Sequence, residues 1–162
     1  MGLLMMLVFK VGWAKPVPVN MYKFKNPKIG MAATALAGPM CNVLISIVSL
    51  FLFGFLYMPL INNAVGSYTL EVIKLTAYMS VGLAVFNLIP LPPLDGSKVL
   101  FSCLSDENYY KLMRYEKYGT ILMIALVASG VLGRPLSAAI GQIYSWLTVF
   151  ANFGMELSIK IM

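Results

Sequence analysis

Long uncharged runs, separated by short polar segments, dominate the pattern of this chain. Residues 31–61 contain no charged side chain, and several further apolar runs follow. A helix needs about 20 consecutive apolar residues to cross a bilayer. The pattern therefore predicts an all-α integral membrane protein with about four transmembrane helices. We expect the spans at residues 31–57, 72–91, 119–133 and 136–155.

The polar segments predict which side of the membrane each loop faces. Residues 13–30 contain four lysines, and residues 97–118 hold half of the other charges. Short loops rich in lysine and arginine usually stay on the cytoplasmic side. We therefore expect 13–30 to be a cytoplasmic loop, extended at 15–20, and 97–118 to form one or two short cytoplasmic helices. Residues 58–70 should face outside.

The first residues are apolar, but the run is too short for a span. It stops at Lys10, far short of about 20 residues. A secretory signal fits poorly, because no basic residue precedes the run and no small-residue cleavage site follows it. We interpret residues 1–12 as the remnant of a membrane helix, which adds a partial N-terminal helix to the fold, or as an interfacial helix.

Composition supports one membrane domain over residues 1–162. The chain is 60% hydrophobic and only 11% charged, whereas soluble domains carry about 25% charged residues. Its net charge of +6 lies mainly in loops beside apolar runs, so we expect a bilayer and not a nucleic acid as its partner. Two cysteines, Cys41 and Cys103, provide no disulfide framework, and the sequence has no histidine.

The end of the second predicted span is broken by proline. Residues 87–96 read Asn-Leu-Ile-Pro-Leu-Pro-Pro-Leu-Asp-Gly, and proline removes a helix hydrogen bond and clashes with the preceding turn. Non-helical backbone at membrane depth should be buried in protein or line a watery cavity. Asp95 is therefore a candidate functional residue. The alternative is an N-cap or Asx turn before a helix over 97–104.

A second polar feature lies near the start of the first span. Asn42 follows Gly38 by four residues, which places both on one helix face, and Pro39 should kink or interrupt the run. Taken alone, this pattern is typical of helix packing with a polar clasp. With 13–30 inside, the first span leads out and the second returns. Gly38 and Asn42 then share a depth with residues 87–96, which predicts a site.

These residues resemble the site-2 protease family of intramembrane zinc metalloproteases. The strongest similarity is Asn87-x-x-Pro90-x-Pro92-x-Leu94-Asp95-Gly96, which resembles the family motif N-x-x-P-x-P-x-L-D-G. Residues 37–42, Ala-Gly-Pro-Met-Cys-Asn, resemble its A-G-P-x-x-N segment. Residues 12–20, with Asn-Pro at 26–27, resemble a loop of its small bacterial members. The resemblance runs from about residue 10 to residue 150.

The resemblance implies a zinc-dependent peptidase core that ends one helix with proline-rich backbone. Asp95 would be the third zinc ligand, and the loop over 15–28 would present the substrate. The residues implied to bind substrate are Gly38, Asn42, Asn87, Pro90 and Pro92. The implied substrate or partner is a transmembrane protein segment, and the implied location is the cell membrane, crossed several times.

The chain also departs from this family. The other two ligands would be the histidines of H-E-x-x-H, whose glutamate is the general base, and this chain has no histidine. It therefore offers no catalytic residue, and we expect it alone neither to bind zinc nor to cleave peptides. A zinc site from Cys41, Cys103 and Asp95 is the less favoured alternative. We interpret the chain as truncated, by a late start or as a gene fragment; the alternative is a pseudoprotease that binds partner helices.

Overall fold

The computed structural model describes residues 23–161 except Tyr115, and it is built from helices. The described residues include no strand, so the all-α prediction is confirmed. The predictions for 1–12 and for the extended backbone at 15–20 lie outside these residues. The helices are α2 (Pro27–Leu60), α3 (Ala64–Asn87), α4 (Asp95–Ser102), α5 (Asp106–Arg114), α6 (Glu116–Ala128) and α7 (Gly133–Ile161).

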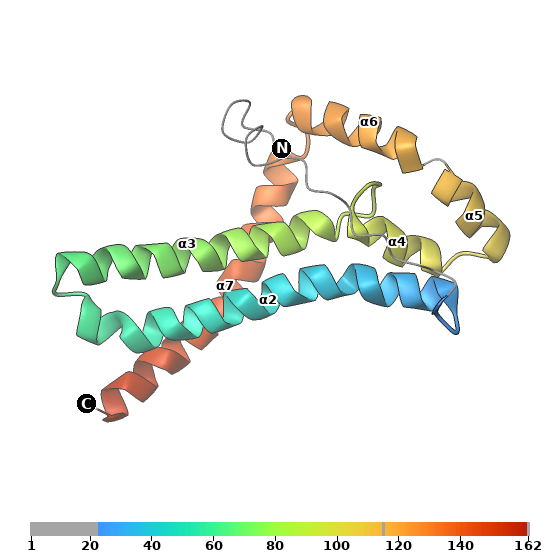
Figure 1. Ribbon diagram of the computed structural model, residues 1–162. Coiled ribbons are helices and arrows are strands. Elements are labelled where there is room, and N and C mark those ends of the chain that lie inside the picture. The colour runs from blue at the N-terminus through green and yellow to red at the C-terminus, as the bar shows by residue number, and fades with distance from the viewer. Residues whose placement is uncertain (1–22, 115, 162) are drawn as a thin grey trace, which may run out of the picture.

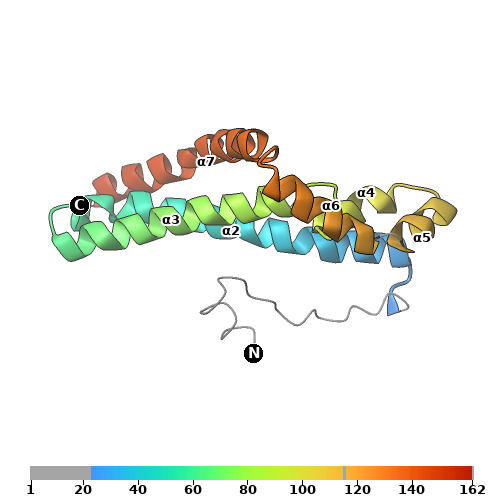
Figure 2. The ribbon, with the colours of Figure 1, turned by 90° about the horizontal axis from the view of Figure 1, so that it is seen from above.

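Two long helices, α2 and α3, form an antiparallel hairpin, and α7 lies across one face of it (Figures 1 and 2). Asparagine side chains cap both helix starts. The Asn26 side chain accepts a hydrogen bond from Ile29 N at 3.4 Å, and Asn63 Oδ1 accepts one from Gly66 N at 3.2 Å. Such caps satisfy backbone N–H groups that a helix leaves unpaired.

Small residues bring α2 and α7 into close contact. A Cβ atom on Gly54 would lie 1.8 Å from the carbonyl oxygen of Ala151, and one on Gly154 would lie 2.3 Å from that of Phe51. The core around this crossing contains Leu50 and Ala77. Helices in membranes commonly pack through small residues, because the backbones can then approach closely.

Helices α4, α5 and α6 lie at the end of the hairpin where α2 begins (Figure 1). Lys28 connects α5 and the loop before it to α2. Its ammonium donates to the carbonyl oxygen of Leu104, lies 2.8 Å from Asp106 Oδ1, and sits 5.7 Å from the centre of the Tyr109 ring. The polar segment predicted at 97–118 is not one continuous helix. It is interrupted at 103–105, between α4 and α5, and α6 begins before the segment ends.

The number of spans differs from the four that the pattern predicts. α2 and α3 are each long and apolar enough to cross a membrane. α6 and α7 qualify only as a pair, and they are bent by 88°. α6 has 13 residues, and at 1.5 Å per residue it is about 20 Å long, too short for a bilayer core of about 30 Å. The described residues therefore hold two candidate spans, or three if the bent pair counts as one.

The turn between α6 and α7 lies earlier than the sequence suggests. Residues 133–135, Gly-Arg-Pro, form the first turn of α7, where proline is tolerated because its missing N–H has no helix partner. The chain instead bends at 129–132, where Gly130 has a φ of 71°. Glycine adopts this left-handed conformation without the steric cost that other residues carry.

Candidate functional site

The two predicted polar features meet in the structure. Asp95 is the first residue of α4, and a Cβ atom on Gly38 of α2 would lie 3.5 Å from Asp95 Oδ2. The Asp95 side chain is 35% exposed. Gly38 therefore leaves room for a carboxylate beside the backbone of the neighbouring helix. The contact joins residues that are far apart in the sequence.

Asp95 does not cap the helix that it begins. The N-cap residue of α4 is Leu94, and no side chain caps the helix. The Asp95 carboxylate instead lies 3.7 Å from the Lys98 ammonium, one turn farther along α4. The capping alternative considered from the sequence is therefore wrong. An acidic side chain in the first turn is still favourable, because the helix dipole is positive there.

The proline-rich stretch forms a sequence of tight turns. Leu91 N donates to Ile89 O at 2.8 Å, and Leu94 N donates to Leu91 O at 3.0 Å. The chain then folds back so closely that a Cβ atom on Gly96 would lie 2.3 Å from Leu88 O. The helix break that the prolines predict is therefore present, and the turns place Asp95 against α2.

Of the prolines assigned to substrate binding, Pro90 is exposed and Pro92 is half-buried. A Cβ atom on Gly119 of α6 would lie 2.4 Å from Pro92 Cβ, so α6 packs directly on this turn. Pro92 thus supports α6, a role that the motif alone did not suggest. The peptide bond between Pro92 and Pro93 is cis.

The two asparagines assigned to substrate binding are half-buried. Asn42 lies one turn beyond Gly38 in α2, and Asn87 is the last residue of α3. Within the part of the chain that the structure describes, neither side-chain amide makes a hydrogen bond. The interhelical clasp considered for Asn42 is therefore not formed among these residues. With respect to them, both amides keep their donors and acceptors available.

The described residues do not complete a zinc site. A catalytic zinc takes three protein ligands and an open position. No three His, Cys, Asp or Glu side chains come together among residues 23–114 and 116–161. Cys41 and Cys103 are exposed free thiols and form no metal cluster with Asp95. Asp95 can supply one ligand, and the donor set around it does not fit a zinc ion on its own.

Two residues near the site were missed from the sequence. Lys98 faces Asp95, and its i, i+3 spacing is a signal that could have identified the pair. Gly119 supports Pro92, but nothing near Gly119 in the sequence indicates this contact, since it depends on how α6 packs.

Comparisons with known proteins show which family the chain is similar to. Residues 58–132, which include the proline-rich turns and Asp95, match the model of peptidase family M50. The chain is 30% identical over 131 residues to "Putative zinc metalloprotease YwhC" of Bacillus subtilis. The matched region covers 77% of this chain and 58% of that relative. It is 32% identical over 100 residues to "Putative zinc metalloprotease MJ0611" of Methanocaldococcus jannaschii, covering 62% of this chain and 49% of that relative.

A third relative, "Zinc metalloprotease MJ0392" of the same archaeon, is 30% identical over 139 residues, which cover 85% of this chain and 37% of the relative. The chain thus spans less than two thirds of each of these curated relatives. No solved structure matches the chain significantly. With the family match and these relatives, the chain belongs to peptidase family M50, the site-2 protease family.

Proposed function

We propose that this chain forms the substrate-binding and aspartate side of a site-2-type intramembrane zinc metalloprotease, which hydrolyses peptide bonds of membrane proteins. The observation that carries the proposal is the position of the Asp95 carboxylate beside Gly38 of α2. Two motifs separated by more than fifty residues thus lie side by side at one end of the hairpin, which supports a shared site. An acid in this setting is a functional candidate by default.

The amides of Asn42 and Asn87 would hold the substrate. A transmembrane substrate hides its backbone N–H and C=O groups inside a helix, and these groups need new partners once the helix unwinds. An amide side chain can donate and accept hydrogen bonds at the same time. Neither Asn42 nor Asn87 uses its amide within the described part of the chain, so both can pair with an extended substrate.

Asp95 would be one zinc ligand of the family site. The sequence contains no histidine, so histidine ligands and a glutamate base of an H-E-x-x-H motif would have to come from residues other than these 162. We accordingly propose that the 162-residue chain by itself neither binds catalytic zinc nor cleaves peptides.

The test is complementation with a separate helix that carries H-E-x-x-H. The purified chain alone should hold far less than one zinc ion per molecule, whereas the complemented complex should hold about one and cleave a transmembrane peptide. Asp95→Ala should abolish both zinc binding and cleavage. Asp106→Ala is the control, since Asp106 is exposed and pairs with Lys28 away from Asp95. Asp95-dependent proteolysis by the chain alone would refute the proposal that the 162-residue chain is inactive by itself.

A second candidate function is that of a pseudoprotease, which binds helices of partner proteins without cutting them. The absence of histidine from the sequence favours it. A labelled transmembrane peptide should then bind the chain alone, more weakly after Asn42→Ala or Asn87→Ala. Asn62→Ala, in the exposed loop between α2 and α3, is the matched control. Equal binding by all variants would exclude the asparagines from capture.

A further inference from the structure

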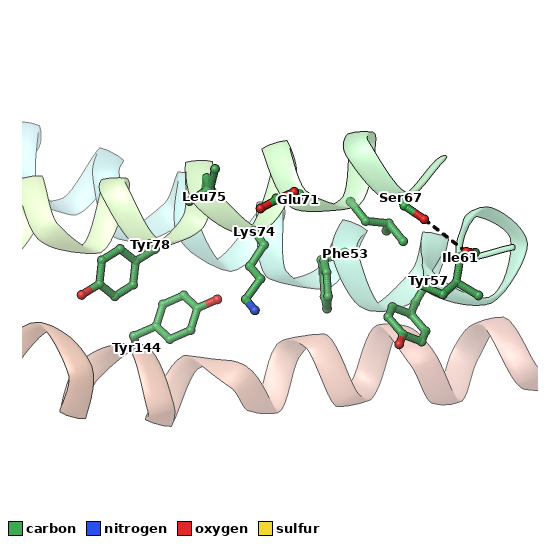
Figure 3. Close-up of a pocket in the computed structure, with 10 residues that line it drawn as sticks. Phe53, Tyr57, Ile61, Ser67, Glu71, Lys74, Leu75, Tyr78 and Tyr144 are labelled. Atoms are coloured by element: carbon green, nitrogen blue, oxygen red, sulfur yellow. Dashed lines mark hydrogen bonds between the residues drawn. The ribbon is translucent and has the colours of Figure 1, made fainter. Parts of the chain in front are cut away.

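A cavity lies at the other end of the hairpin, far from Asp95. It has a volume of about 360 Å³, is open to the surface, and is lined by residues of α2, α3 and α7 (Figure 3). Phe53, Tyr57 and Tyr144 give it aromatic walls, and Glu71 and Lys74 give it one acid and one base. The proposed protease site uses none of these residues, so the cavity needs a separate explanation.

Glu71 and Lys74, the two charged residues of this cavity, form no ion pair with any described residue. Glu71 and Lys74 are both exposed, and the ion pairs among the described residues are Lys28–Asp106 and Lys98–Asp95. Figure 3 shows the Lys74 side chain extending from α3 toward α7, near Tyr144. A base and an acid, one turn apart on a membrane helix, can therefore both bind an external ligand.

The position of the cavity along α3 places it at the level of the lipid headgroups. Glu71 and Lys74 follow the hairpin loop at 61–63, and the stretch from 75 to 94 that comes after them has no charge. Charged residues and tyrosines concentrate where the apolar core of the bilayer ends. Tyr57, Tyr78 and Tyr144 all line the cavity, which agrees with this depth.

We propose that this cavity binds the headgroup of phosphatidylethanolamine. From the water inward, this lipid presents an ammonium group, a phosphate and then acyl chains. Along α3 the cavity presents Glu71, then Lys74, then apolar side chains that begin with Leu75. Residues three apart on a helix are separated by about 4.5 Å along its axis, a distance that the ethylene spacer between ammonium and phosphate can bridge. The ammonium therefore pairs with Glu71 and the phosphate with Lys74.

Helices α3 and α7, which both line this cavity, can also accommodate an acyl chain of the lipid. Farther along α3 and α7 lies a second, apolar cavity of about 210 Å³, lined by residues that include Val85, Leu132 and Leu136. Between the two cavities, a Cβ atom on Gly82 would lie 3.7 Å from Ile140 Cδ1, so the seam there is apolar. A soluble zwitterion would not use this seam, which is why we assign the cavity to a lipid.

Native mass spectrometry of the full 162-residue chain in detergent tests this assignment. The probes are phosphatidylethanolamine, phosphatidylcholine and phosphatidylglycerol with identical acyl chains, and soluble phosphoethanolamine. Phosphatidylethanolamine should bind about tenfold more tightly than each of the others. Lys74→Gln and Glu71→Gln should each weaken it about tenfold, the loss expected for one charge-assisted contact. Lys160→Gln, an exposed lysine near the end of α7, should leave the affinity unchanged.

The other outcomes overturn the assignment in distinguishable ways. Tighter binding of phosphatidylglycerol, unaffected by Glu71→Gln, would indicate an anion site. Equal binding of phosphatidylcholine would show that aromatic contact with a quaternary ammonium is enough, and equal binding of phosphoethanolamine would exclude the acyl chain. Unchanged affinity in both variants would place the lipid elsewhere. Glu71 and Lys74 are exposed, so both variants should fold, and helix content measured by circular dichroism checks this.

Discussion

At the scale of single residues, two glycines of α2 do different things. Gly54 lies at the crossing with α7, where a Cβ atom would meet backbone at 1.8 Å. Gly38 lies beside Asp95, where a Cβ atom would meet only a carboxylate oxygen at 3.5 Å, an ordinary contact. Gly54 is therefore required for packing, whereas Gly38 determines how much space surrounds the proposed zinc ligand.

We predict that Gly54→Ala destabilises the protein by about 1–3 kcal/mol, because the added methyl group forces α2 and α7 apart. Gly38→Ala should change the free energy of unfolding by less than about 0.5 kcal/mol, as expected where no overpacking results. Thermal unfolding in detergent, followed by circular dichroism, measures both. A similar loss of stability in the two variants would show that α2 and α7 do not cross at Gly54.

Individual site residues could be predicted only where the motif itself carried the information. Asp95 and Gly38 were identified from the sequence, and opposite chain directions in two successive spans were enough to place them at one depth. The Asp95–Lys98 pair and the support of Pro92 by Gly119 were not foreseen. Those contacts depend on side-chain direction and on packing between distant segments, which a hydrophobic pattern does not encode.

At the scale of elements, the junction between α4 and α5 shows why boundaries were harder to predict. Residues 103–105, Cys-Leu-Ser, contain neither proline nor glycine, so nothing local signals the break. Lys28 of α2 binds the carbonyl oxygen of Leu104 and the carboxylate of Asp106. A residue about 76 positions away therefore helps fix the helix end. By contrast, the end of α3 was predictable, because three prolines follow it.

We predict that Lys28→Met loosens this junction without unfolding the protein. Asp106 is 82% exposed, so solvent screens the ion pair and the loss should be at most about 1 kcal/mol. Hydrogen exchange at 103–110 should become severalfold faster, since local opening follows the lost contacts. Lys25→Met is the control, because Lys25 is exposed and forms no ion pair among the described residues. Equal exchange in both variants would contradict the role of Lys28.

At the scale of the whole molecule, the length of α2 determines what the membrane can cover. Its 34 residues extend about 51 Å at 1.5 Å per residue, longer than the roughly 40–45 Å of a bilayer with its headgroups. Both hairpin ends therefore reach water. The end near Lys28 and Lys98 also carries α4 and α5, and the other end carries the loop at 61–63. The chain is an integral membrane protein with more than one span, and we propose that the lysine-rich end is cytoplasmic.

Cysteine labelling from one side of the membrane tests this orientation. In sealed right-side-out vesicles, Asn62→Cys should react with a membrane-impermeant maleimide, because residue 62 is exposed in the outer loop. Native Cys103, exposed at the end of α4, should react only after permeabilisation.

Cys41 lies 14 residues into α2, about 21 Å from its start, so it should resist the reagent although it is exposed in the structure. Replacing Cys41 with serine keeps its signal out of the measurement. Labelling of Cys103 before permeabilisation, with protection of residue 62, would reverse the topology and place the Asp95 end outside.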